Sequence, residues 1–405
     1  MTVADNPDLI SSYAARLNPA LLHGHATISP LGVWLLLALV GPAATGQSRR
    51  DLETVLGTTV ADAQSRAQLL LEEPHPAVSA IAAVWDRDLG PAFHRWARTL
   101  PGPVERGPVP DQLHANAWAE QRTDGRITEF ALDIDDLTRL ILASALTTDI
   151  SWAKPLGTST ELGGEFGAQI GRALVVDDGA QLVADTAAAG LVAVTAPPTS
   201  SALDVLSVIA APDVGAERVD RAAHQVAAML RGDTTGARVI PADQLTDGHS
   251  WIVTERRVRG FGGSPVEIRW RSHLPAWSAS SSHDLDGAPG MSSVFSALAG
   301  FARPEDQPVE LAAKQTAVAS YGREGFTAAA VTAIAMVPGS MPTIREVLVR
   351  NVDVRFNRPY AVLATAATDQ GPPAWRGVPL FSAWITKPDD TVVHAPQHPQ
   401  PVGVR

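Results

Sequence analysis

The spacing of the apolar residues changes once along this chain, and the change restricts the folds that the chain can adopt. In the first third, apolar residues recur at helical spacing, as in the segment 8–17. The segment 137–152 is instead β-branched and nearly uniformly apolar, which is typical of a central strand covered on both faces. Helices that cluster early and strands that follow them predict an α+β fold.

Residues that begin and end helices divide the first third further. Ser29 is placed to cap a helix that starts with Pro30 and is interrupted at Gly41, and a second helix should end at Gly57. A short strand is predicted over 77–87 and a helix over 110–122. Later strand candidates are the segments 180–198, 203–212, 264–285 and 352–367, with an amphipathic helix over 217–232.

Composition excludes several classes of function. A net charge of −11 argues against nucleic acid or an anionic membrane as partner. The absence of cysteine excludes disulfides, thiolate metal sites and a cysteine nucleophile. The longest apolar run, 31–44, is too short to span a bilayer, and residues 1–19 lack the apolar core of a signal peptide. We therefore expect a soluble protein in the cytoplasm, although export is not excluded.

Motifs of catalysis and metal binding are also missing. The sequence contains no nucleophile elbow, no HExxH zinc motif and no phosphate-binding P-loop. His23 and His25 form the one short histidine pair considered, and without a neighbouring acid they fit a surface loop better than a metal site. We expect no enzyme, no metal and no cofactor.

The stretch "REGFTAAAVTAIAMVPGS" (323–340) is unusual because it is almost uncharged after Glu324 and rich in alanine. Taken alone, it fits a buried helix, an ordinary core strand or a segment that changes its structure. An exposed loop that later slides into a sheet needs a flexible pivot, which Gly325 provides. It also needs small side chains, and it needs some β-propensity, which Val331 and Thr332 supply.

Several separate segments, taken in order, resemble the serpin family of serine protease inhibitors, here a serpin-like protein of bacterial type. The resemblance runs collinearly from Leu9 to Pro388. The segments are "ATISPLGVWLLLALVGPAATGQSRRDLETVLG" (26–57), "NAWAEQRTDGRIT" (116–128), "LILASALTTDISWAKPL" (140–156), "LPAWSASSSHDLDGAPGMSSVFS" (274–296) and the C-terminal hairpin from "RFNRPY" to "ITKP" (355–388).

This resemblance implies the serpin fold, with a large central mixed β-sheet, smaller sheets, a set of helices and an exposed reactive-centre loop. It places a single domain at 1–388, the loop at about 325–347 and a flexible tail at 389–405. It implies a monomer without a cofactor. The loop hinge would comprise Gly325, Phe326, Thr327, Ala328, Ala329, Ala330, Val331 and Thr332.

The mechanism implied by the resemblance is suicide inhibition, in which a serine protease cleaves the loop and is trapped while the loop inserts as a strand. The family's usual spacing from Gly325 places the scissile bond between Gly339 and Ser340. The alternatives are Met336, Met341 and Arg345. Small or methionine residues suit an elastase- or subtilisin-like protease, whereas an arginine suits a trypsin-like one.

Some residues depart from the family pattern. Phe326 stands where threonine or serine is usual, Gly32 replaces a serine, Ser144 replaces an asparagine, and Gln315 stands where histidine is common. The residues expected to let the central sheet open are Ser29, Ser144, Trp152 and Gln315. The alternative function is therefore a non-inhibitory serpin-fold binding or carrier protein, whose loop is cleaved without trapping a protease.

Overall fold

The computed structural model describes residues 5–148, 150–260, 266–301, 313–325 and 345–390. Helices gather in the first third of the chain and strands dominate the rest, so the expected α+β fold is confirmed. The helices are α1 (Asn6–Leu21), α2 (Pro30–Val40), α3 (Gly46–Leu56), α4 (Val60–Glu72), α5 (Pro91–Ala97), α6 (Gln112–Arg122), α7 (Gly164–Gly167), α8 (Ala216–Leu230) and α9 (Met291–Ala299), with short turns of 3-10 helix at η1 (Gly41–Ala43) and η2 (Pro373–Trp375).

The strands of the described residues form one large sheet and three smaller ones. The seven-stranded sheet is antiparallel throughout and has the order β1 (Ala26–Ile28), β17 (Pro379–Ile385), β16 (Tyr360–Ala366), β9 (Leu203–Ile209), β8 (Gly190–Ala196), β7 (Ala180–Thr186), β10 (Ala237–Ile240). The five-stranded sheet has the order β11 (Trp251–Gly260), β15 (Arg345–Arg355), β12 (Val266–Leu274), β6 (Ala173–Val176), β5 (Gly157–Ser159). A three-stranded sheet contains β3 (Glu105–Pro108), β2 (Val78–Asp86) and β4 (Leu140–Thr148), and a two-stranded sheet pairs β13 (Trp277–Asp284) with β14 (Lys314–Tyr321).

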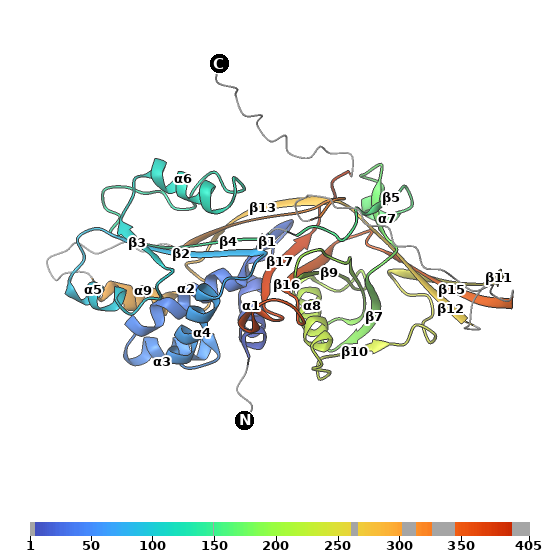
Figure 1. Cartoon of the computed structure of the whole chain (residues 1–405), viewed down its shortest axis with the longest axis horizontal. Helices are drawn as coiled ribbons and strands as arrows, with labels where there is room; N and C mark the ends of the chain where they lie inside the picture. Colours follow the sequence, from blue (N-terminus) through green and yellow to red (C-terminus); the bar gives the residue numbers. More distant parts are fainter. Residues whose placement is uncertain (1–4, 149, 261–265, 302–312, 326–344, 391–405) are drawn as a thin grey trace, which may run out of the picture.

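Helix α2 lies at the centre of the molecule. Nearly all of its residues are buried, and it packs against both β4 and β17, so it lies between the three-stranded and the seven-stranded sheets. Figure 1 shows β2, β4 and β13 running in one layer beside this helix. The apolar run 31–44 is therefore a buried helix, as its length predicts.

The predicted helix ends agree with the structure. The hydroxyl of Ser29 accepts a hydrogen bond from the N–H of Gly32, and Pro30 is the first residue of α2. Gly57 closes α3 with a positive φ of 75°, a conformation in which a residue without Cβ is unstrained.

Strand β4 differs from the expectation of a central strand covered on both faces. Its burial alternates along most of its length, and it is the edge strand of the three-stranded sheet among the described residues. Strands β11 and β14 were not predicted. In β11 the apolar residues 251–253 are followed by the polar run 254–257, and β14 contains few large apolar residues. The edge of β4 that has no paired strand among the described residues forms one side of the candidate site.

Candidate functional site

Strands β4 and β14 face each other across an interruption in the layer. β4 pairs with β2 and β14 pairs with β13, but no hydrogen-bonded ladder joins β4 to β14 within the described ranges. Beyond the ends of these strands, Ser151 and Gly325 form an isolated bridge between the two sides. We call this interruption, with Ser151–Gly325 at one end and Ser144 and Gln315 at the other, the slot.

The bridge end of the slot is closed by backbone hydrogen bonds. The N–H of Trp152 donates to the carbonyl of Glu324 at 3.2 Å, and the N–H of Leu156 donates to the carbonyl of Arg323 at 2.9 Å. The indole N–H of Trp152 also donates to the carbonyl of Gly322 at 2.9 Å. The chain that follows β14 is therefore fastened to the chain that follows β4.

Position 325 requires glycine for a second reason besides flexibility, namely the lack of space for a side chain. Its φ is 154°, and a Cβ on this residue would lie 2.3 Å from the carbonyl oxygen of Ile150 and 2.8 Å from the Cα of Ser151. Any side chain would push the two backbones apart. The close approach at the bridge therefore requires glycine at this position.

The opposite end of the slot is held by polar side chains that converge on the start of α2. The backbone N–H of Ser29 donates to Oε1 of Gln315 at 3.0 Å, and Nε2 of Gln315 donates to the carbonyl of Ser29 at 3.0 Å. From the other wall, the hydroxyl of Ser144 donates to the carbonyl of Gly32 at 3.3 Å. Each wall of the slot is thus bound to α2 rather than to the other wall.

Gly32 leaves room for this convergence. A Cβ at Gly32 would lie 3.2 Å from Nε2 of Gln315 and 3.3 Å from Oγ of Ser144. These distances are tighter than ordinary van der Waals contact. The glycine that replaces the family's serine therefore fits the side chains of Ser144 and Gln315 that surround it.

His283 belongs to the same end of the slot, and the sequence analysis did not single it out. It lies opposite Gln315 in the pairing of β13 with β14, and its Nε2 donates to the carbonyl of Thr27 at 2.7 Å. Burial lowers the pKa of His283 below its ordinary value, and the hydrogen bond to Thr27 opposes this effect. Its place within the segment 274–296 was the only signal in the sequence.

The structure brings together three of the four predicted sheet-opening residues, Ser29, Ser144 and Gln315, and places Trp152 at the opposite end. Of the predicted hinge and scissile-bond residues, Gly325 and Arg345 lie within the described ranges. Arg345 is the first residue of β15 and pairs with Gly260 of β11. The other predicted loop residues lie outside the described residues, namely Phe326, Thr327, Ala328, Ala329, Ala330, Val331, Thr332, Met336, Gly339, Ser340 and Met341.

The pair His23 and His25 is not assembled as a metal site. Nε2 of His25 contacts the carbonyl of Ser278 at 2.7 Å, and its Nδ1 accepts hydrogen bonds from the N–H groups of Thr386 and Lys387. Both ring nitrogens are thus occupied by backbone groups. The residues that the structure describes hold no group of three metal-ligating side chains.

The start of the predicted tail is held in place. The N–H of Asp389 donates to the carbonyl of Ala276 at 2.7 Å, and the carboxylate of Asp390 accepts from the N–H of Gly171 at 2.9 Å. The rest of the tail, 391–405, lies outside the described residues.

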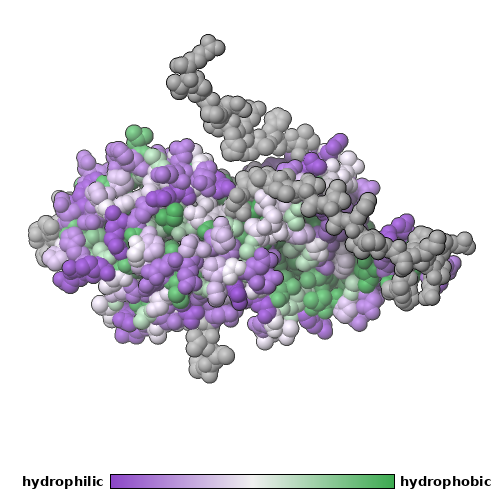
Figure 2. Space-filling model, in the orientation of Figure 1, coloured by the Kyte–Doolittle hydropathy of each residue, from purple (hydrophilic) through white to green (hydrophobic). Residues whose placement is uncertain are grey.

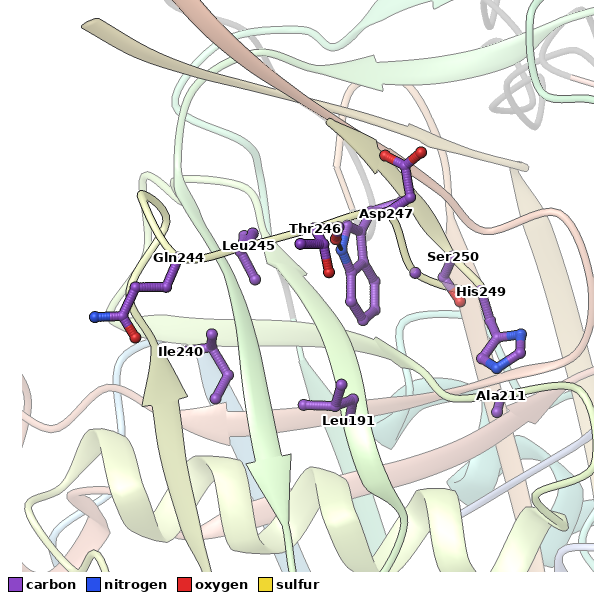
Figure 3. Close-up of a pocket in the computed structure, with 11 residues that line it drawn as sticks. Leu191, Ala211, Ile240, Gln244, Leu245, Thr246, Asp247, His249 and Ser250 are labelled. Carbon is purple, nitrogen blue, oxygen red and sulfur yellow. Dashed lines mark hydrogen bonds between the residues drawn. The ribbon is translucent and has the colours of Figure 1, made fainter. Parts of the chain in front are cut away.

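A pocket of about 570 Å³ lies apart from the slot, between β8, β10 and the connection that leads to β11. Leu191 and Ile240 line one side of it, and the connection 244–251 lines the other (Figure 3). Figure 2 shows hydrophobic surface in the lower right of the molecule, where Figure 1 places β7 and β10. Leu191 and Val239 in this region are 50% and 49% exposed.

Three hydrogen bonds hold the connection on the outer side of the pocket. The indole N–H of Trp251 donates to the carbonyl of Thr246 at 2.8 Å, and the carboxylate of Asp247 accepts from the N–H of Val253 at 2.8 Å. The guanidinium of Arg358 donates to the carbonyl of His249 at 3.3 Å. These bonds hold the connection in place.

No helix within the described ranges has the length and apolar character needed to cross a membrane.

Comparison with known proteins agrees with this architecture. Residues 11–169 match the sequence model of the serpin (serine protease inhibitor) family. A comparison with curated protein sequences gives no match.

Solved structures of serpins resemble the chain along most of its length. Human thyroxine-binding globulin complexed with thyroxine is 14% identical, with 94% of this chain and 98% of that chain covered and a TM-score of 0.63. Serpin48 of the insect Tenebrio molitor is 14% identical, with 96% and 100% covered and a TM-score of 0.61. The thermophilic serpin tengpin in its native state is 12% identical, with 95% and 96% covered and a TM-score of 0.65. The serpin family model matches residues 11–169, and the likeness to these solved structures shows the serpin fold along nearly the whole chain.

Proposed function

We propose that this serpin inhibits a serine protease by cleavage of its reactive-centre loop, trapping of the acyl-enzyme and insertion of the loop into the slot. The protein acts as an inhibitor and not as a catalyst, and it works as a monomer in the cytoplasm. Its domain comprises residues 1–388, with the loop at about 325–347. An elastase- or subtilisin-like protease, cutting between Gly339 and Ser340, is the preferred target.

The slot is the observation that carries this proposal. The side chains of Ser144 and Gln315 mark one end of it and Ser151 and Gly325 the other, so β4 and β14 run in the same direction. A segment that turned back at Gly325 would run antiparallel to both walls and satisfy the open edges of both strands. The segment that follows Gly325 in the chain is the alanine-rich one.

The length of the slot suits the start of that segment. Gln315 precedes Gly325 by ten residues. At the common rise of about 3.3 Å per residue, a returning strand of similar length would comprise roughly residues 326–335. Those residues are "FTAAAVTAIA", which is uncharged and mostly small.

Incubation with elastase and subtilisin tests the proposal. We expect a covalent complex that survives SDS, and we expect the cleaved protein to unfold at a higher temperature than the intact one. Ala330→Glu should abolish the complex and leave a protein that is merely cleaved, because insertion would carry a charge into the sheet. Ala61→Glu, at an exposed position of α4, is the matched control. If the cleaved chain gains no thermal stability, insertion is wrong for this protein.

The pocket favours a second candidate, a serpin-fold carrier of small apolar molecules. It is preformed, and one of the structural neighbours was solved in complex with thyroxine. A carrier would be cleaved by proteases without trapping them and would quench or enhance the fluorescence of Trp251 on binding an apolar probe. Leu191→Asp should abolish that change while leaving protease trapping intact.

A further inference from the structure

Strand β15, which follows the loop in the chain, is enclosed on both sides. Residues Arg345–Val354 pair antiparallel with Trp251–Gly260 of β11, and Leu348–Arg355 pair parallel with Val266–His273 of β12. Figure 1 shows the three strands running together to the right end of the molecule, away from the helices. The strand that anchors the far end of the loop is therefore an interior strand.

Further contacts hold β15 in this position. The guanidinium of Arg350 bonds to the carboxylate of Glu255 and to the carbonyl of Leu245. Val347 and Val349 are 4% and 0% exposed. Freeing β15 would break these contacts together with the hydrogen bonds of its ladders.

Arg345 is paired on one side among the described residues, because the pairing with β12 begins at Leu348. Its backbone pairs with Gly260, and the next residue, Glu346, pairs with Arg259. A protease cleaves an exposed segment far more readily than a hydrogen-bonded strand, which must first open locally. Cleavage after Arg345 would require β15 to leave β11 at least in part.

The arginine before the loop is restrained as well. The carbonyl of Arg323 accepts from the N–H of Leu156 at 2.9 Å, and its Nε donates to the carbonyl of Leu156 at 3.1 Å. Between these two arginines, the segment 326–344 contains no lysine and no arginine. The basic residues on the two sides of this segment, Arg323 and Arg345, thus both have backbones that are hydrogen-bonded to or paired with another part of the chain.

We infer that pairing with β11 withholds Arg345 from proteases, so that the partner of this serpin is a protease that cleaves after a small or apolar residue and not a trypsin-like one. The inference rests on the proposed function and sharpens it, because the sequence alone leaves Arg345 open as bait. Substrate recognition by trypsin-like proteases depends on a basic side chain, and the segment 326–344 contains none.

Limited digestion with trypsin tests the inference, with mass spectrometry of the fragments. In the unaltered protein, we expect cleavage after Arg323 or Arg345 to be at least about 100-fold slower than cleavage after residue 339 in a Gly339→Arg variant, because the native sites open only by local unfolding. Comparable rates would overturn the inference. So would resistance of Gly339→Arg, since the segment would then be inaccessible to any such protease.

A pair of proline variants tests whether β11 is the cause. Successive N–H groups of a strand point to opposite sides, so only one of Arg257→Pro and Val258→Pro removes a hydrogen bond to β15. We expect one member of the pair to accelerate tryptic cleavage after Arg345 and the other to behave like the unaltered protein. If neither variant accelerates it while both remain folded by circular dichroism, β11 does not protect Arg345.

The same digestions separate this inference from the proposed function. If elastase and subtilisin cut within 326–344 without forming an SDS-stable complex, inhibition fails while the protection of Arg345 stands. If trypsin forms such a complex through Arg345, inhibition stands and the inference fails.

Discussion

The side-chain amide of Gln315 and the backbone of Ser29 exchange two hydrogen bonds, one in each direction. Through this pair, β14 is fastened to the start of α2. The hydroxyl of Ser144, in β4, donates a hydrogen bond to the carbonyl of Gly32 in the first turn of α2. Both walls of the slot are therefore positioned by α2, and neither needs a ladder with the other to stay in place.

Replacing Gln315 by alanine should destabilise the protein. The N–H of Ser29 would lose its partner in a buried place, and the carbonyl of Ser29 would keep only the N–H of Val33. Such a loss typically lowers the free energy of unfolding by about 1–3 kcal/mol. Urea denaturation measures the change. Gln68→Ala, which removes an exposed glutamine bonded only to Glu72, is the control and should have little effect. Equal losses for the two variants would contradict a special role for Gln315.

Gly325→Ala should open the bridge end of the slot. The added methyl group would meet the carbonyl oxygen of Ile150 at 2.3 Å, so the two backbones must separate. We expect a loss of about 1–3 kcal/mol, the usual range for overpacking. Gly322→Ala is the matched control, because a Cβ there would meet only the carbonyl oxygen of Gly325, at 3.8 Å. Thermal unfolding of both variants distinguishes a steric cause from a general effect of losing glycine.

Phe326→Thr tests whether a large side chain at the start of the loop limits insertion. If Phe326 enters the sheet and overpacks it, threonine should lower the number of inhibitor molecules consumed for each protease trapped. Titration of a fixed amount of subtilisin measures this ratio. An unchanged ratio would mean that the sheet accommodates the phenylalanine.

Acid should weaken the fold through His283. Burial lowers its pKa, so between that lowered value and the ordinary value of about 6.5 the unfolded chain binds the proton and the folded chain does not. The contribution of the neutral His283 ring to the free energy of unfolding is therefore fully present above about pH 6.5. It decreases as the pH falls below this value.

His283→Gln keeps a donor for the carbonyl of Thr27 but removes the titration. We expect the free energy of unfolding to fall less steeply between pH 7 and pH 5, by up to about 1.4 kcal/mol per pH unit. Equal slopes for His283→Gln and the unaltered protein would show that His283 does not titrate in this range.

The sequence by itself determined the helix ends and the α+β class, because both depend on local chemistry. Ser29 caps α2 with its own hydroxyl, and Gly57 ends α3 by adopting a positive φ, whatever lies elsewhere in the chain. Trp152 was also recognisable, because it stands in the segment 140–156, and Gln315 was recognised as a departure from the family pattern.

Tertiary structure alone decided which strands pair and which do not. Apolar composition made β4 look like a fully covered central strand, yet pairing depends on a partner far along the chain, and β14 pairs with β13 instead. The pairing of β15 with β11 likewise joins residues far apart in the chain, such as Gly260 and Arg345, which are 85 positions apart. No local pattern encodes such a neighbour, because hydrogen bonds between strands are made by backbone groups that every residue except proline carries.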